Sequence, residues 1–252
     1  MNDSYFKRTS RPTVISLFTH SWWLFSSKPA FFTLLAFAAF LPTQLSNAIF
    51  ALTLRSSPDL AGIFLWLNMT LSFALLQLAM AALVYSAYAA LRGRTDSLNT
   101  ALTAVFNRLG TLIVISIILG ICGPLIQMAL MRTVFSVIAP SQDLYLFLNT
   151  ILRSLIKAFT VAVIPICIIE GRGAIDSVTA GIQLTASHVL TIFILVVIVG
   201  QLAGGVNNLI ESYLPGRINN SLLSLHIIAF PVSAFFVAFE YVMYTVIYMD
   251  LR

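Results

Sequence analysis

The sequence predicts an all-α, polytopic transmembrane helical bundle, and three observations support this prediction. Of the 252 residues, 59% are apolar and 9% are charged, whereas ordinary soluble domains have about 45–50% and about 25%. The mean hydropathy is +0.95, and the uncharged runs reach the roughly 20 residues that cross a bilayer as a helix. A segment of the chain also repeats without a gap. Since backbone groups in lipid must be paired within the protein, these runs are expected to be helices.

The first element is an amphipathic helix from Val14 to Phe25 that follows a polar, basic N-terminal segment. Its apolar residues Val14, Phe18, Trp22 and Phe25 recur at helical spacing, and Lys28 and Pro29 end the pattern. The tryptophans are typical of headgroup depth. We therefore expect this helix to lie in the membrane interface.

Six membrane spans follow in a single integral membrane domain that covers residues 1–252. Each span is a long apolar run bounded by polar or charged residues. The predicted spans are Ala30–Leu54, Ala61–Leu91, Thr111–Ala139, Leu144–Glu170, Val189–Ile210 and Leu222–Met249.

Basic residues orient the six spans, because cytoplasmic loops are enriched in Lys and Arg. One side then carries Lys7, Arg8, Arg11, Lys28, Arg92, Arg94, Arg108, Arg172 and Arg252, and the other carries Arg55, Arg132 and Arg217. Both termini are therefore expected in the cytoplasm.

An internal repeat divides the chain into three similar units. Asp96–Gly120 aligns with Asp176–Gly200 at an offset of 80 residues, and an offset of 81 places Phe25 on Phe106. The units are about 13–91, 95–170 and 173–252. Each is expected to contain a cytoplasmic-face amphipathic helix and two spans, the helices being Val14–Phe25, Leu98–Leu109 and Val178–Val189.

Two Gly-Arg pairs, Gly93-Arg94 and Gly171-Arg172, are each followed shortly by Asp-Ser. Gly is expected to end the preceding helix, and Asp96 or Asp176 to cap the next helix or complement its dipole. The alternative is a catalytic aspartate pair, but capping accounts for the residues.

The segment 162–185 carries Pro165, Glu170, Gly171, Ser177, Leu184 and Thr185. In this order the residues resemble the signature of a bacterial inner-membrane family, the YciC-like proteins and the membrane domain fused to some glycerophosphodiester phosphodiesterases. The resemblance implies a six-span fold in the bacterial inner membrane. It implies no reaction and no catalytic residues.

Motifs for soluble chemistry are missing from the sequence. His20, His188 and His226 do not have metal-ligand spacing, and there is neither a Gly-rich phosphate loop nor a nucleophile elbow. We therefore predict no enzyme activity, no cofactor and no metal. Nucleic acid is not an expected partner, because the basic residues are scattered at helix ends.

Charges within the predicted spans are the most informative residues, because each costs about 2.5–3.5 kcal/mol at the helix centre on insertion scales. At 1.5 Å per residue, Lys157 lies about 20 Å from Glu170, and Glu240 lies about 15 Å from Asp250. The two are thus at similar depth, and we predict an intramembrane charge pair. The alternative is that Lys157, like Arg153, snorkels to the outer face.

Arg132, Arg153 and Lys157 lie among polar side chains in the outer half, including Gln127 and Asn149. Interhelical hydrogen bonds explain many of these polar residues, but their concentration also suits a hydrated basic recess for an anionic headgroup. The first functional hypothesis is therefore binding or transport of an anionic lipid or amphiphile, with membrane lipids as partners. The alternatives are a scaffold or assembly partner of another membrane protein complex and, third, a membrane-embedded enzyme.

Overall fold

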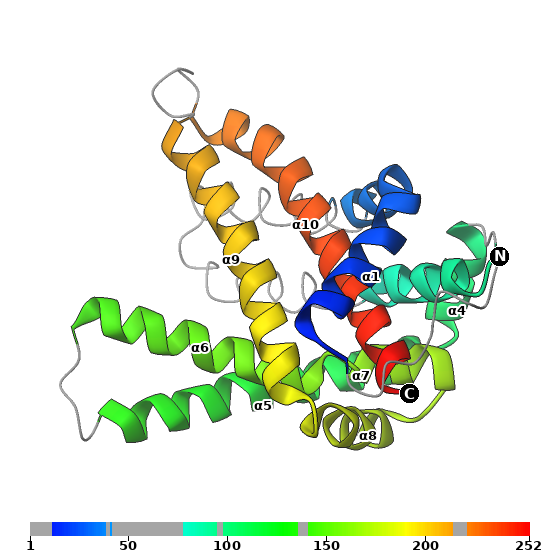
Figure 1. Ribbon diagram of the computed structural model, residues 1–252, viewed down its shortest axis with the longest axis horizontal. Coiled ribbons are helices and arrows are strands. Elements are labelled where there is room, and N and C mark those ends of the chain that lie inside the picture. The colour runs from blue at the N-terminus through cyan, green and yellow to red at the C-terminus, as the bar shows by residue number, and fades with distance from the viewer. Residues whose placement is uncertain (1–11, 39–40, 42–77, 95–97, 136–140, 214–220) are drawn as a thin grey trace, which may run out of the picture.

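The computed structural model describes residues 12–38, 41, 78–94, 98–135, 141–213 and 221–252 (Figure 1). Within these ranges the secondary structure is helical and contains no strand, which confirms the predicted all-α class. Four of the described helices are long and apolar enough to cross a membrane: Leu109–Thr133, Phe147–Glu170, Val189–Val206 and Pro231–Leu251. This supports a membrane protein. The first two predicted spans lie mostly outside the described residues, and only their ends appear, as the apolar helices Pro29–Ala38 and Leu78–Leu91.

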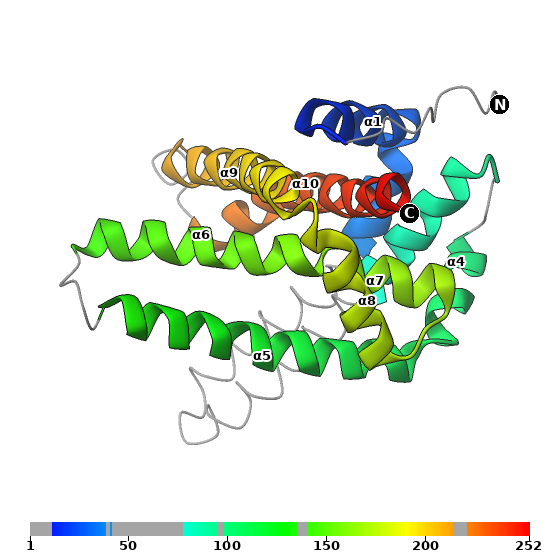
Figure 2. The same ribbon diagram turned by 60° about the horizontal axis from the view of Figure 1, so that its bottom comes forward.

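Helix α1 (Val14–Ser27) is the predicted N-terminal amphipathic helix. It begins after Thr13, whose hydroxyl accepts from the backbone N–H of Ser16 in a capping box that satisfies orphan groups of the first turn. Its buried face, which includes Leu17, Leu24 and Phe25, packs on α10 (Ser221–Leu251). Figure 2 shows α1 lying over α10 on the side away from α5 and α6.

Three short helices are each separated from the next helix by a short break that has the same backbone hydrogen bond. The first break comes directly after α1. The second separates α4 (Leu98–Phe106) from α5 (Leu109–Phe135), and the third separates α8 (Ala174–Ala186) from α9 (Val189–Tyr213). At the breaks the backbone N–H groups of Lys28, Arg108 and His188 donate to the carbonyl three residues earlier, at 3.2, 2.9 and 3.0 Å. These residues recur every 80 positions, so the first segment aligns at 80 rather than the predicted 81.

The fourth predicted span is not one regular helix. Helix α6 (Gln142–Thr160) ends, and α7 (Val163–Pro165) and a π-helix, η2 (Ile166–Glu170), continue the segment. Pro165 has no N–H and disturbs the helical bonds before it. In this interrupted stretch the Phe159 carbonyl accepts a bond from the Thr185 hydroxyl of α8 at 2.9 Å. A side chain thus satisfies a backbone group that would otherwise be costly in a membrane.

Glycines explain how α8 approaches this segment. A Cβ at Gly181 would lie 2.7 Å from Val163 Cγ2 and 3.1 Å from its backbone nitrogen, so only glycine allows the contact.

Gly93 and Gly171 have φ of 70° and 71°, in the left-handed region, and follow Leu78–Leu91 and η2. The prediction that both glycines end helices is confirmed.

Two smaller expectations are corrected. The N-cap of α8 is Gly173, and Asp176 lies in the first turn, where it can complement the dipole but does not cap. Asp96 lies outside the described residues. The small-xxx-small spacing of Gly200 and Gly204 on α9 favours a close packing contact within the bundle over a dimer face, yet a Cβ at either position would meet no described atom within 4 Å.

The helices form layers when seen from the side (Figure 2). Helix α1 lies on α10, α9 and α10 lie side by side, and α6 and then α5 follow beyond them. The buried core runs between α1, α10 and α9, with Phe25 and Phe235 at 4.9 Å between ring centroids. The α5–α6 hairpin extends away from this core at its far end.

Candidate functional site

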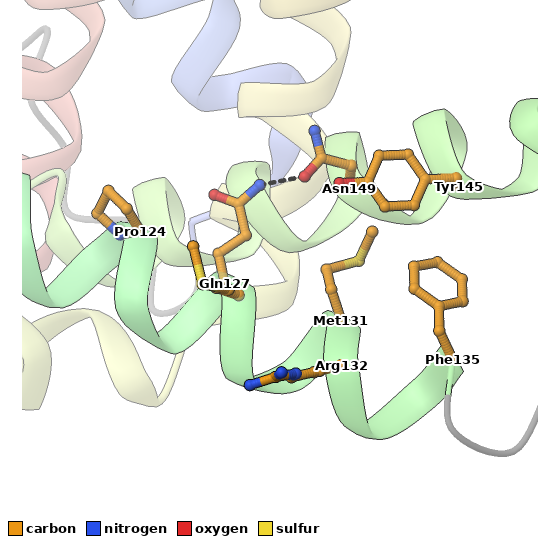
Figure 3. Close-up of a pocket in the computed structure, with 8 residues that line it drawn as sticks. Pro124, Gln127, Met131, Arg132, Phe135, Tyr145 and Asn149 are labelled. Atoms are coloured by element: carbon orange, nitrogen blue, oxygen red, sulfur yellow. Dashed lines mark hydrogen bonds between the residues drawn. The ribbon is translucent and has the colours of Figure 1, made fainter.

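A recess lies between α5 and α6 toward the end of the hairpin where the two helices are connected (Figure 3). Its volume is about 850 Å³, within the range of about 300–1,000 Å³ that ligand pockets occupy. Apolar and polar side chains both line it. The lining residues are Pro124, Gln127, Met128, Met131, Arg132, Phe135, Tyr145 and Asn149.

The polar groups of this recess are arranged across its two helices. Gln127 Nε2 on α5 donates to Asn149 Oδ1 on α6, which links the walls. Met131 and Phe135 point from α5 toward α6, while Arg132 lies along α5 at the edge of the recess (Figure 3). No ion pair of Arg132 with another described residue is present. The recess therefore offers one uncompensated cation beside an apolar surface.

Only one of the three predicted recess cations lines this cavity. Arg132 does, whereas Arg153 and Lys157 on α6 are not among its lining residues. Arg153 is exposed, and Lys157 is directed to α10. Tyr145 was not singled out from the sequence, since an aromatic residue near a span end is typical of any interface.

The structure brings Lys157 and Glu240 together, with 2.9 Å between Nζ and Oε1. Both lie within membrane-length apolar helices, Phe147–Glu170 and Pro231–Leu251. The Glu240 side chain is 18% exposed and that of Lys157 is 47% exposed. The contact thus joins a largely buried carboxylate to a half-exposed ammonium group.

Tyr244 is a third member of this cluster that the sequence reading missed. Its hydroxyl donates to the same Glu240 Oε1, and its ring packs edge-on against Tyr241. Tyr244 follows Glu240 by four residues on α10, which places both side chains on one helix face. That spacing is the signal that could have identified it.

A second charged cluster ties η2 to the end of α10. Glu170 accepts from Tyr248 Oη at 2.9 Å and from Arg172 Nε at 2.6 Å, and Arg252 Nε lies 3.2 Å from its Oε1. Nearby, His20 Nδ1 on α1 lies 3.3 Å from Asp250 Oδ2. These contacts fix the middle of α1 and the ends of η2 and α10 relative to one another.

The described residues contain no group of three or more His, Cys, Asp or Glu side chains that could hold a metal ion. Neither a protein-family model, nor a curated protein sequence, nor a solved structure matches the chain. The site must therefore be interpreted from its own chemistry.

Proposed function

We propose that the chain binds an anionic lipid or a related amphiphile in the recess between α5 and α6, without catalysing a reaction. The observation that carries this proposal is the combination of Arg132, Gln127 and Asn149 with the apolar surface of Met128, Met131 and Phe135 around one cavity. An anionic headgroup would be held by the guanidinium and amides. The flexible methionines would accommodate an acyl chain of variable shape.

The position of the recess along the hairpin is consistent with headgroup depth. Arg132 lies in the last turn of α5, at the opposite end from the helix start at Leu109. At 1.5 Å per residue this separation is about 35 Å, which exceeds the roughly 30 Å of hydrocarbon. A ligand there could keep its charge in the interface and its chain in lipid.

The wider architecture that we propose has six spans in three similar units, with both termini in the cytoplasm of a bacterium and the spans in its inner membrane. The nine-to-three distribution of basic residues supports the orientation. The equivalent breaks at Lys28, Arg108 and His188 support the units. The resemblance of the segment 162–185 to the YciC-like family supports the membrane.

Native mass spectrometry of the full chain in detergent tests the proposed ligand, with phosphatidylglycerol and phosphatidylcholine as probes. We expect preferential binding of phosphatidylglycerol, and R132Q should weaken it about tenfold or more, because a hydrogen bond to a charged group contributes roughly 1.5–3 kcal/mol. R153Q is the matched control, since Arg153 is an exposed arginine that does not line the recess. Equal binding of both lipids, or equal binding to R132Q and the unchanged protein, would refute the proposal.

One observation favours the alternative of an assembly partner in a membrane complex. Gly200 and Gly204 form a small-xxx-small pair that is exposed on α9, a surface that lets another membrane helix approach closely. Stoichiometric co-purification of a second membrane protein that is lost in G200L would favour this role.

A further inference from the structure

A second, smaller cavity lies where α1 meets the helix Pro29–Ala38. Its volume is about 120 Å³, and its lining comes from the start of that helix and from the end of Leu78–Leu91. The lining residues are Lys28, Phe31, Phe32, Ser86, Ala90 and Arg94. It is separate from the recess between α5 and α6, with which it shares no residue.

Two cations face this cavity, and no carboxylate of the described residues lines it. Neither Lys28 nor Arg94 forms an ion pair with any residue of the described ranges. Arg92, two residues before Arg94, packs over the Tyr88 ring with its Cζ at 5.4 Å from the centroid and does not line the cavity. The cavity thus concentrates positive charge beside apolar walls and one hydroxyl, that of Ser86.

The equivalent junction elsewhere in the fold has a carboxylate next to its glycine. Arg108 occupies the break that corresponds to Lys28, and its guanidinium lies against Gly171, with Cζ 3.2 Å from the position of a Cβ. Gly171 is preceded by Glu170, which binds Arg172. Gly93, the corresponding glycine beside the smaller cavity, is preceded by Arg92 rather than by a carboxylate. The same framework therefore has a carboxylate beside the glycine at one junction and a cavity lined by two cations at the other.

We propose that the cavity at Lys28 and Arg94 binds a phosphate group, either on the headgroup of an anionic lipid or as a free phosphate. The volume suits a compact anion, since it corresponds to about four water molecules at roughly 30 Å³ each and is well below the size of drug-sized pockets. Trp22 and Trp23 of the adjoining helix are 50% and 43% exposed, and exposed indoles are typical of headgroup depth. A lysine and an arginine supply charge-assisted hydrogen bonds to phosphate oxygens.

The test measures ligand binding to the full chain in detergent. The parent protein carries R132Q, which removes the cation of the recess between α5 and α6. R132Q protein is titrated with phosphatidylglycerol in one arm and with inorganic phosphate in the other, while thermal stability and native mass spectra are recorded. K28Q and R94Q should each weaken binding about tenfold or more, and K28R should restore it because the charge is kept. R92Q is the matched control, because it removes a neighbouring cation that does not line the cavity.

The two arms separate the sources of the phosphate. Binding of both probes with the same dependence on Lys28 and Arg94 assigns the site to phosphate as such, and binding of the lipid alone assigns it to a headgroup. If K28Q does not fold, R94Q decides, because Arg94 is exposed beyond the end of Leu78–Leu91. The proposal is overturned if neither probe binds, if R94Q binds like its parent, or if R92Q weakens binding as much as R94Q. None of these results depends on whether the recess at Arg132 binds lipid.

Discussion

Replacing Lys157 with methionine would test whether the contact with Glu240 stabilises the bundle. The change removes the ammonium group that lies 2.9 Å from Glu240 Oε1 and leaves a carboxylate whose side chain is only 18% exposed. Tyr244 would remain as its one described donor. An uncompensated charge in such surroundings is destabilising, because it loses its partner without regaining full hydration.

The magnitude follows from the unequal exposure of the two side chains. Loss of one partner from a fully buried pair costs about 3–5 kcal/mol, and surface pairs contribute about 0–1 kcal/mol. Since Lys157 is 47% exposed, we expect an intermediate loss of about 2 kcal/mol for K157M. E240Q should cost only about 1 kcal/mol, because the stranded Lys157 can extend its flexible stem toward a polar region.

The double variant K157M/E240Q distinguishes a real interaction from two separate effects. It removes both charges together, so its loss should be about 1 kcal/mol rather than the roughly 3 kcal/mol that additive effects would give. Thermal unfolding in detergent measures this, with a shift of roughly 2–4 °C per kcal/mol for a chain of this size. R153M is the control, because Arg153 precedes Lys157 by four residues on α6 and is exposed.

Additive losses within about 0.5 kcal/mol would refute the pairing argument. Lys157 would then be better explained by snorkelling to the outer face, as the sequence alone also allowed. Glu240 would in that case be the unexplained charge of the two, and the first position to test for proton or cation binding.

Three further predictions address packing, hydrogen bonding and topology. G181A should destabilise the protein by about 1–3 kcal/mol through overpacking on α7, whereas G200A, in open space, should be neutral or slightly stabilising in thermal unfolding. T185V should lower the free energy of unfolding by about 1 kcal/mol, because the hydrogen bond to the Phe159 carbonyl of α6 is lost. T179V should have little effect, because the Thr179 hydroxyl bonds to Ile175 within its own helix. Equal losses of stability in the two variants would contradict this prediction. A reporter fused after Arg172 should give a cytoplasmic signal, and an external signal would exclude the proposed six-span topology.

The helical class and the approximate positions of the described helices followed from hydropathy and helical period, but the residues that each helix face contacts did not. Arg132, Arg153 and Lys157 lie among polar side chains of the outer half, including Asn149, which suggested a single basic recess. In the structure Asn149 accepts a hydrogen bond from Gln127 on α5, whereas Lys157 donates one to Glu240 on α10. Helix periodicity defines which residues share a face, and the crossing of helices, which depends on packing across the whole bundle, determines what that face contacts.

The break in the fourth span illustrates a different limit. Pro165 is visible in the sequence and makes a disturbance predictable. The Phe159 carbonyl near this disturbance is satisfied by the Thr185 hydroxyl, which lies 26 residues away in the sequence. Such a bond depends on the close approach of α8 that Gly181 allows, so it could be recognised only after the helices were placed.

The breaks at Lys28, Arg108 and His188 share a backbone hydrogen bond and a pattern of burial but differ in residue type. Three residues before each break the chain has Phe25, Val105 and Thr185, all buried to 1% exposure or less, although one is aromatic, one aliphatic and one polar. Four residues after each break another apolar side chain is buried. Burial thus follows the 80-residue period, but residue type does not. In the three-unit architecture that we propose, packing constrains the buried positions and leaves the polar positions free to differ, so that one junction has Glu170 and another has Arg92. Distinct ligands at equivalent places in the fold are the expected consequence.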